Sequence, residues 1–105
     1  MFNKNKVVEE SFTPVTKEEL QELNRKYLED VEKKYLGLDK FINEEIRKRT
    51  ANGYANYEYD FYHHPFVNFM SKRFEEFVKS YQDRGFNVSV NRALGIIELK
   101  WYHLL

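Results

Sequence analysis

The stretch FNVSVNRALGIIELKW, residues 86–101, has the pattern of a β-hairpin and anchors the predicted fold. Each half alternates apolar and polar residues, which is typical of a strand with one buried face. The segment Asn91–Gly95 lies between the two halves and predicts the turn. The expected inward positions are Phe86, Val88 and Val90 in the first half, and Ile97, Leu99 and Trp101 in the second.

Residues 65–84, directly before the hairpin, are expected to form a helix. Pro65 suits the first helical position because its missing N–H has no intrahelical acceptor there. Gly85 is a typical end signal, after which Phe86 can fold back onto the helix. That predicted helix carries a wide apolar stripe: Phe66, Phe69, Met70, Phe74, Phe77, Val78 and Tyr81.

The aromatic segment YANYEYDFY, residues 54–62, predicts another strand. Successive side chains of a strand point to opposite faces. The expected core face carries Ala55, Tyr57, Tyr59 and Phe61. The other face is expected to stay open and carries Tyr54, Asn56, Glu58, Asp60 and Tyr62.

Two helices are predicted in the N-terminal half. Thr16 and Glu19 form a capping box that begins the first helix, and Gly37 is expected to end it. Its apolar stripe comprises Leu20, Leu23, Tyr27, Val31 and Tyr35. This helix is expected to pack on the domain; the alternative is a homo-oligomer seam through residues 16–36. A second helix is expected from about residue 38 to Ala51, stopped by Asn52-Gly53, with Phe41, Ile42 and Ile46 on its inner face.

These elements predict an α+β fold in the order α-α-β-α-β-β. The strand–helix–strand crossover followed by a hairpin predicts a small three-stranded mixed sheet, with helices packed on one face. Residues 1–15 are expected to be an extended arm, and residues 16–105 a single domain.

Composition narrows the functional classes. The chain has 105 residues and no cysteine, which excludes a disulfide framework and a thiolate nucleophile. We expect neither a signal peptide nor a membrane span, and a cytoplasmic location. Its 17 basic and 17 acidic residues give no net attraction to nucleic acid or lipid. Aromatic residues reach 17%, which suits either a small core or a binding surface.

The segment YEYDFYHHP, residues 57–65, is the most suggestive cluster of chemical groups. Asp60 and His64, with a distant His103, form the best metal or acid–base candidate. Neighbouring histidines in a strand point to opposite faces, and no specific zinc motif is present. A strand-to-helix junction with His64 at the cap is therefore the favoured interpretation, without a metal site.

No other motif predicts catalysis. Glu58 and Asp60 can share a face, but a catalytic carboxylate pair needs a pocket that separates their pKa values. No serine nucleophile setting, phosphate loop or dinucleotide fingerprint is found in the sequence. Arg47 and Arg49, in the densest basic run, suit the C-terminal end of a helix dipole. We expect a protein that is not an enzyme, has no cofactor and does not bind nucleic acid.

Three segments carry a resemblance to a known type of protein: FINEEIRKRTANG at residues 41–53, a helix ending in DRGFNVSV at residues 83–90, and GIIELKW at residues 95–101. With the aromatic strand between them, this layout resembles small bacteriophage accessory proteins. The resemblance implies an accessory protein in the cytoplasm of an infected host cell that binds a host, phage or defence factor, or joins the virion.

Three functional hypotheses follow. The first is stoichiometric binding of a protein partner, which could inhibit a host or defence factor, through Tyr54, Glu58, Asp60 and Tyr62. The second is a small-ligand or nucleotide-binding sponge in which Arg47, Arg49 and Arg92 hold phosphates. The third is a virion or assembly component whose arm, residues 1–15, grips a neighbour.

Overall fold

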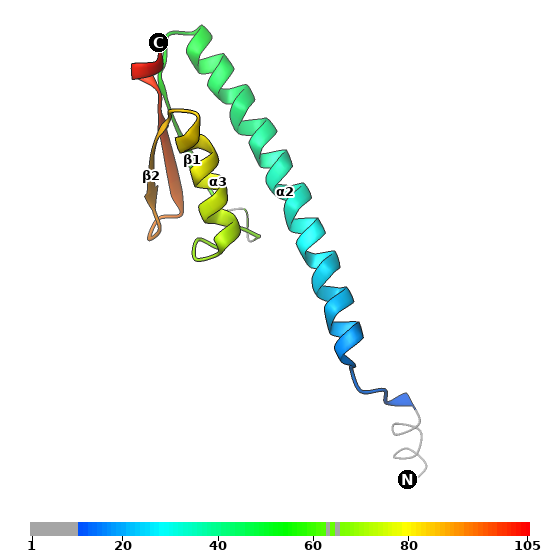
Figure 1. Ribbon diagram of the computed structural model, residues 1–105. Coiled ribbons are helices and arrows are strands. Elements are labelled where there is room, and N and C mark those ends of the chain that lie inside the picture. The colour runs from blue at the N-terminus through cyan, green and yellow to red at the C-terminus, as the bar shows by residue number, and fades with distance from the viewer. Residues whose placement is uncertain (1–10, 63, 65) are drawn as a thin grey trace. The chain divides into compact units, whose positions relative to one another are not determined.

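The computed structural model describes residues 11–62, 64 and 66–105. Within this part of the chain, the α+β class is confirmed (Figure 1). The elements are helix α2 (Lys17–Ala51), strand β1 (Asn56–Asp60), helix α3 (Lys72–Asp83), strands β2 (Asn87–Asn91) and β3 (Ile96–Lys100), and a 3₁₀ turn η1 (Tyr102–Leu104). They fall into two compact units, residues 1–30 and 31–105.

The first unit contains the start of α2. The Glu19 N–H donates to Thr16 Oγ1 at 3.1 Å, which confirms Thr16 as the cap that begins the helix. Leu20, Leu23 and Tyr27 are each more than half exposed, so their expected burial is not found within this unit. The predicted arm falls largely on residues 1–10, outside the described part, and its boundary stays a prediction.

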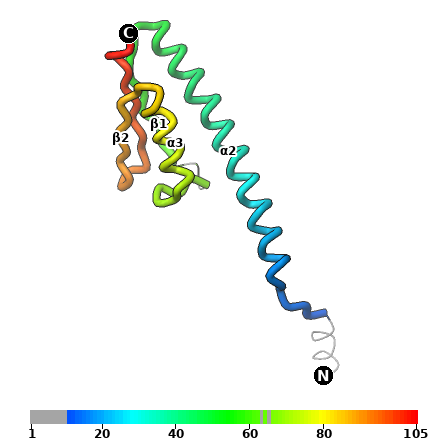
Figure 2. The backbone as a smooth tube through the Cα atoms, in the orientation of Figure 1, coloured from blue at the N-terminus to red at the C-terminus, as the bar shows by residue number. Residues whose placement is uncertain are grey.

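The prediction of two N-terminal helices is wrong, because α2 continues through Gly37 to Ala51 (Figure 2). A glycine costs a helix interior only about 0.5–1 kcal/mol relative to alanine. Tyr35 and Leu38, which flank it, are both buried against the rest of the second unit, and their burial outweighs that cost. The predicted stop at Asn52-Gly53 is confirmed, with Gly53 at φ +86°.

The sheet is wholly antiparallel, so the predicted mixed sheet is wrong. Its strand order is β1-β3-β2. Strand β3 lies between β1 and β2, with Glu98 opposite both Glu58 and Ser89. Strands β1 and β2 therefore never become neighbours, although they are joined by a helical crossover. The predicted hairpin is confirmed by β2 and β3.

Helix α3 begins at Lys72, later than the predicted start at residue 65. Its N-cap is Ser71, whose Oγ accepts from the Phe74 N–H at 3.1 Å. Pro65 lies outside the described residues. Because residues 66–70 form turns rather than helix, Phe66 and Phe69 reach the core from a loop and Met70 is 80% exposed.

Both helices of the second unit contact the same face of the sheet. Phe41 of α2 packs edge-on against Tyr59, with ring centroids 5.7 Å apart. Phe74 and Phe77 of α3 pack edge-on against Phe61, at 5.9 and 6.3 Å. The predicted core face of β1 is thus confirmed. The buried core comprises Val31, Tyr35, Leu38, Ile42, Tyr57, Phe61, Val67, Phe74, Phe77, Tyr81, Ile97, Leu99 and Trp101.

Candidate binding groove

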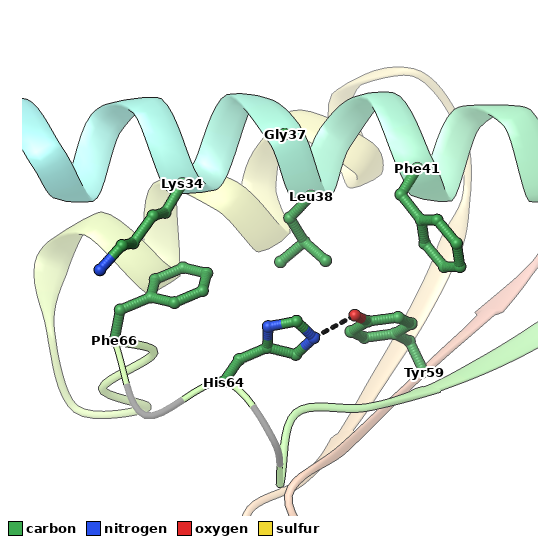
Figure 3. A pocket seen from close by; sticks show the side chains of 7 residues that line it. All are labelled: Lys34, Gly37, Leu38, Phe41, Tyr59, His64 and Phe66. Atoms are coloured by element: carbon green, nitrogen blue, oxygen red, sulfur yellow. Dashed lines mark hydrogen bonds between the residues drawn. The ribbon is translucent and has the colours of Figure 1, made fainter.

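A groove of about 650 Å³ opens beside the middle of α2 (Figure 3). Helix α2 forms one wall, strand β1 supplies Tyr59, and the loop after β1 supplies the other wall. We name this surface the aromatic groove, and its lining residues are Lys34, Gly37, Leu38, Phe41, Tyr59, His64 and Phe66. Its volume lies in the range of ordinary ligand sites.

The loop after β1 turns back and places His64 on Tyr59. The His64 N–H donates to the Phe61 carbonyl at 2.8 Å, which holds the turn. The imidazole stacks on the Tyr59 ring with centroids 5.4 Å apart, and its Nε2 hydrogen-bonds the Tyr59 hydroxyl. Burial raises the pKa of the Tyr59 phenol, and the Asp60 carboxylate adds to that shift. His64 is therefore part of the groove wall and not the predicted helix cap.

Lys34 and Phe66 stand at one end of the aromatic groove (Figure 3). The Lys34 ammonium lies 5.9 Å from the centre of the Phe66 ring, within the range of a cation–π contact. This end therefore combines an apolar ring with a positive charge. The other end is formed by Phe41, which remains 48% exposed even though its ring contacts Tyr59.

Gly37 lies between these two ends, on the wall formed by α2. A methyl group at this position would meet no atom of the chain within 4 Å. No packing contact within the described residues therefore requires glycine here. The absent side chain instead leaves helix backbone accessible from the groove.

The residues predicted to bind a partner lie elsewhere, on and beside the open face of the sheet. Glu58 and Asp60 are exposed on β1, as expected. The Asp60 carboxylate accepts the Tyr62 N–H at 2.7 Å, which fixes the turn after the strand. Tyr54 and Tyr62 are 58% and 80% exposed, before and after the strand. The set is accessible, but its centre is charged rather than aromatic.

The three arginines of the nucleotide alternative are not brought together. Arg49 lies over the Tyr57 ring at 4.7 Å, near the start of β1, whereas Arg92 follows β2 in the hairpin turn. The register places those two points at opposite ends of the sheet. Arg47 pairs with Glu44 at 2.8 Å. Arg49 does share a second, polar hollow of about 600 Å³ with Tyr54.

The histidine and carboxylate candidates are also separated. His103 Nε2 hydrogen-bonds the Gly85 carbonyl at 2.6 Å, while His64 bonds Tyr59. Among residues 11–62, 64 and 66–105, no three histidine or carboxylate side chains gather in a way that could hold a metal ion. His63 lies outside the described residues.

Sequence reasoning missed the aromatic groove as a site. It assigned Phe41, Tyr59 and Phe66 to the core and treated Gly37 as a helix stop. One signal could have pointed to it: the apolar spacing from Tyr35 to Leu38 and Ile42 continues across the glycine without a break. An uninterrupted stripe predicts one helix, and hence a glycine inside it.

Comparisons with protein-family models, with curated proteins and with solved structures found no match to this chain. Within the described part of the chain, no helix is both long and apolar enough to cross a membrane.

Proposed function

We propose that this chain is a non-enzymatic binding protein that acts by stoichiometric contact with a protein partner, and that the aromatic groove holds a short segment of that partner. The observation that carries the proposal is a set of accessible aromatic rings beside exposed helix backbone at Gly37. Cores of protein interfaces are rich in aromatic side chains and poor in charges. The groove fits that description better than the open sheet face, where Glu58 and Asp60 are central.

The chemistry of the groove restricts the bound segment. Phe41 and Phe66 favour an apolar side chain of the partner, because covering them removes apolar surface from water. Lys34 favours a carboxylate next to that side chain. Gly37 lets the segment approach the helix closely. We therefore propose an apolar residue flanked by Asp or Glu as the recognised feature, on a host or phage factor that binding inhibits.

The test compares groove variants with a variant outside the groove. A tagged chain recovers the partner from cells, and calorimetry then measures the affinity of the purified pair. Phe41→Ala is expected to weaken binding about tenfold, as for a residue at the centre of an interface. Gly37→Leu is expected to block the groove. Leu36→Ala, an equally exposed apolar position of α2 that does not line the groove, serves as the control.

Two outcomes would overturn this placement. Groove variants that bind the partner as the unchanged chain does would remove the groove from the interface. If Tyr54→Ala and Tyr62→Ala abolish binding instead, the predicted open-face surface is the site. Stabilisation by nucleotides in a thermal-shift screen, with no protein captured, would replace the proposal by the ligand-binding alternative.

A further inference from the structure

The outer edge of β2 differs from that of β1 in a way that matters for assembly. Strand β2 reads NVSVN, Asn87–Asn91, and contains neither a charged residue nor a proline. Strand β1, at the opposite edge, carries Glu58 and Asp60. Proteins commonly protect sheet edges with charges or proline, since an unprotected edge pairs with another strand. The β2 edge lacks both of these protections.

The backbone hydrogen bonds between the β1 and β3 segments show in which direction the N–H and C=O groups of β2 point. The Phe61 N–H donates to the Gly95 carbonyl at 2.8 Å, and the Trp101 N–H donates to the Ala55 carbonyl at 2.9 Å. Backbone groups along an antiparallel strand alternate between its two sides. The backbone N–H and C=O groups of the odd-numbered residues of β3 therefore point toward β1, and those of the even-numbered residues point toward β2. Their register partners on β2 are Asn87, Ser89 and Asn91, so Val88 and Val90 direct their N–H and C=O groups outward.

We propose that the β2 edge pairs with β2 of a second copy of this chain, antiparallel, across a two-fold axis at Ser89. The two sheets would then join into one of six strands. The segment NVSVN reads the same in both directions, so the two-fold places Asn87 opposite Asn91 of the partner subunit and Val88 opposite Val90 of the partner subunit. The outward backbone groups of Val88 and Val90 supply the hydrogen bonds.

A second copy fits this edge better than an arbitrary strand would. A two-fold interface sets the same surface patch of both copies against each other, and in this strand it pairs valine with valine and uncharged polar residues with their own kind. Uncharged residues face each other throughout, so no like charges are opposed. Val88 and Val90 are only partly buried, and they line a hollow of about 270 Å³ between α3 and β2 together with the charged side chains of Glu75 and Arg92. A paired strand would set each of these two valines beside a valine of the partner and remove more of their apolar surface from water.

The first test uses the absence of natural cysteine. Ser89→Cys places two thiols opposite each other at the axis, in a pair without direct backbone bonds, where Cα atoms are about 4.5 Å apart. That separation suits a disulfide. Mild oxidation is expected to give a covalent dimer of twice the 12.8 kDa chain mass. Glu58→Cys, equally exposed on the other edge strand, is the control and is expected to remain a monomer on a non-reducing gel.

The second test measures the unmodified assembly by native mass and sedimentation. Ser89→Lys opposes two like charges at the axis and is expected to raise the dimer dissociation constant about fivefold. The same lysine lies beside Glu98 within its own chain, so the fold is expected to persist, which circular dichroism verifies. Glu58→Gln makes the same net charge change on β1 and is expected to leave the dimer intact.

Dimer formation through the β2 edge does not depend on partner binding in the aromatic groove, so either proposal can be wrong without the other. A chain that stays monomeric at high concentration, with no disulfide from Ser89→Cys, would overturn it. So would a dimer that survives Ser89→Lys but is lost when Leu20, Leu23 and Tyr27 are changed to serine. That result would assign the interface to residues 16–36.

Discussion

At the scale of single residues, Gly37 connects the fold to the proposed function. The residue lies inside a helix, where glycine is unfavourable, and its missing side chain faces open space on the groove wall. Stability within the chain therefore does not explain the glycine. We propose that the glycine instead gives a partner access to the helix backbone, and on this ground we prefer the groove to the open sheet face as the contact surface.

We expect Gly37→Ala to raise the free energy of unfolding by about 0.5–1 kcal/mol, because alanine loses less backbone freedom in a helix. Urea denaturation measures the change. Gly53→Ala is the matched control, and it is expected to lower the free energy of unfolding. Gly53 has φ +86°, a backbone conformation that strains any other residue. A loss of stability for Gly37→Ala would mean that the added methyl group meets a neighbour.

Buried tyrosines predict a specific weakness in alkali. Burial raises the pKa of Tyr57 to about 12, with a further contribution from Glu45. Burial and then the hydrogen bond to Asp39 raise the pKa of Tyr81 still more. Below pH 10, the ordinary value, these phenols are protonated in both folded and unfolded chains. Above pH 10 the tyrosine side chains ionise in the unfolded chain before they ionise in the folded chain. The free energy of unfolding therefore falls as the pH rises from 10 to about 12.

Urea titrations at a series of alkaline pH values measure this fall. Tyr57→Phe removes one of the ionising groups and is expected to make the dependence shallower. An unchanged slope in Tyr57→Phe would contradict the assignment of the weakness to that phenol.

At the scale of the elements, local patterns predicted the strands and turns better than the helix limits. The hairpin and the buried face of β1 follow from a period of two, which needs no knowledge of partners. The start of α3 was misplaced because Phe66 and Phe69 continue a helical apolar pattern. In the structure these rings enter the core from a loop, and the helix begins only at the cap residue Ser71.

Ser71→Ala tests that helix limit. It removes the acceptor of the Phe74 N–H and is expected to lower the free energy of unfolding by about 1 kcal/mol. Ser80→Ala is the control, because Ser80 lies inside the helix and alanine is favourable there. Equal effects of the two substitutions in urea denaturation would contradict an N-cap role for Ser71.

At the scale of the whole molecule, the described core is confined to one part of the chain. All of its buried residues lie between Val31 and Trp101, whereas Leu20, Leu23 and Tyr27 of the first unit are more than half exposed. The second unit therefore contains every contact of the described core. Residues 11–30 contribute no side chain to this described core, so the oligomer seam predicted for residues 16–36 stays a prediction.

A chain that consists of residues 31–105 is accordingly expected to keep a cooperative unfolding transition and the circular dichroism of a mixed helix and sheet fold. Its transition is expected at a somewhat lower urea concentration, because its helix lacks the Thr16 cap. Loss of the cooperative transition would show that residues 1–30 contribute to the stability of the second unit.

The sequence by itself determined the α+β class, the hairpin, the inward face of β1 and both ends of α2, because periodicity and capping depend on neighbours along the chain. Tertiary structure decided the rest. Insertion of β3 between β1 and β2 made the sheet antiparallel, and burial on both sides of Gly37 kept α2 whole. The aromatic groove arose where His64 folds onto Tyr59 beside that helix. Each of these outcomes depends on contacts between segments far apart in sequence, whose relative energies no local pattern records.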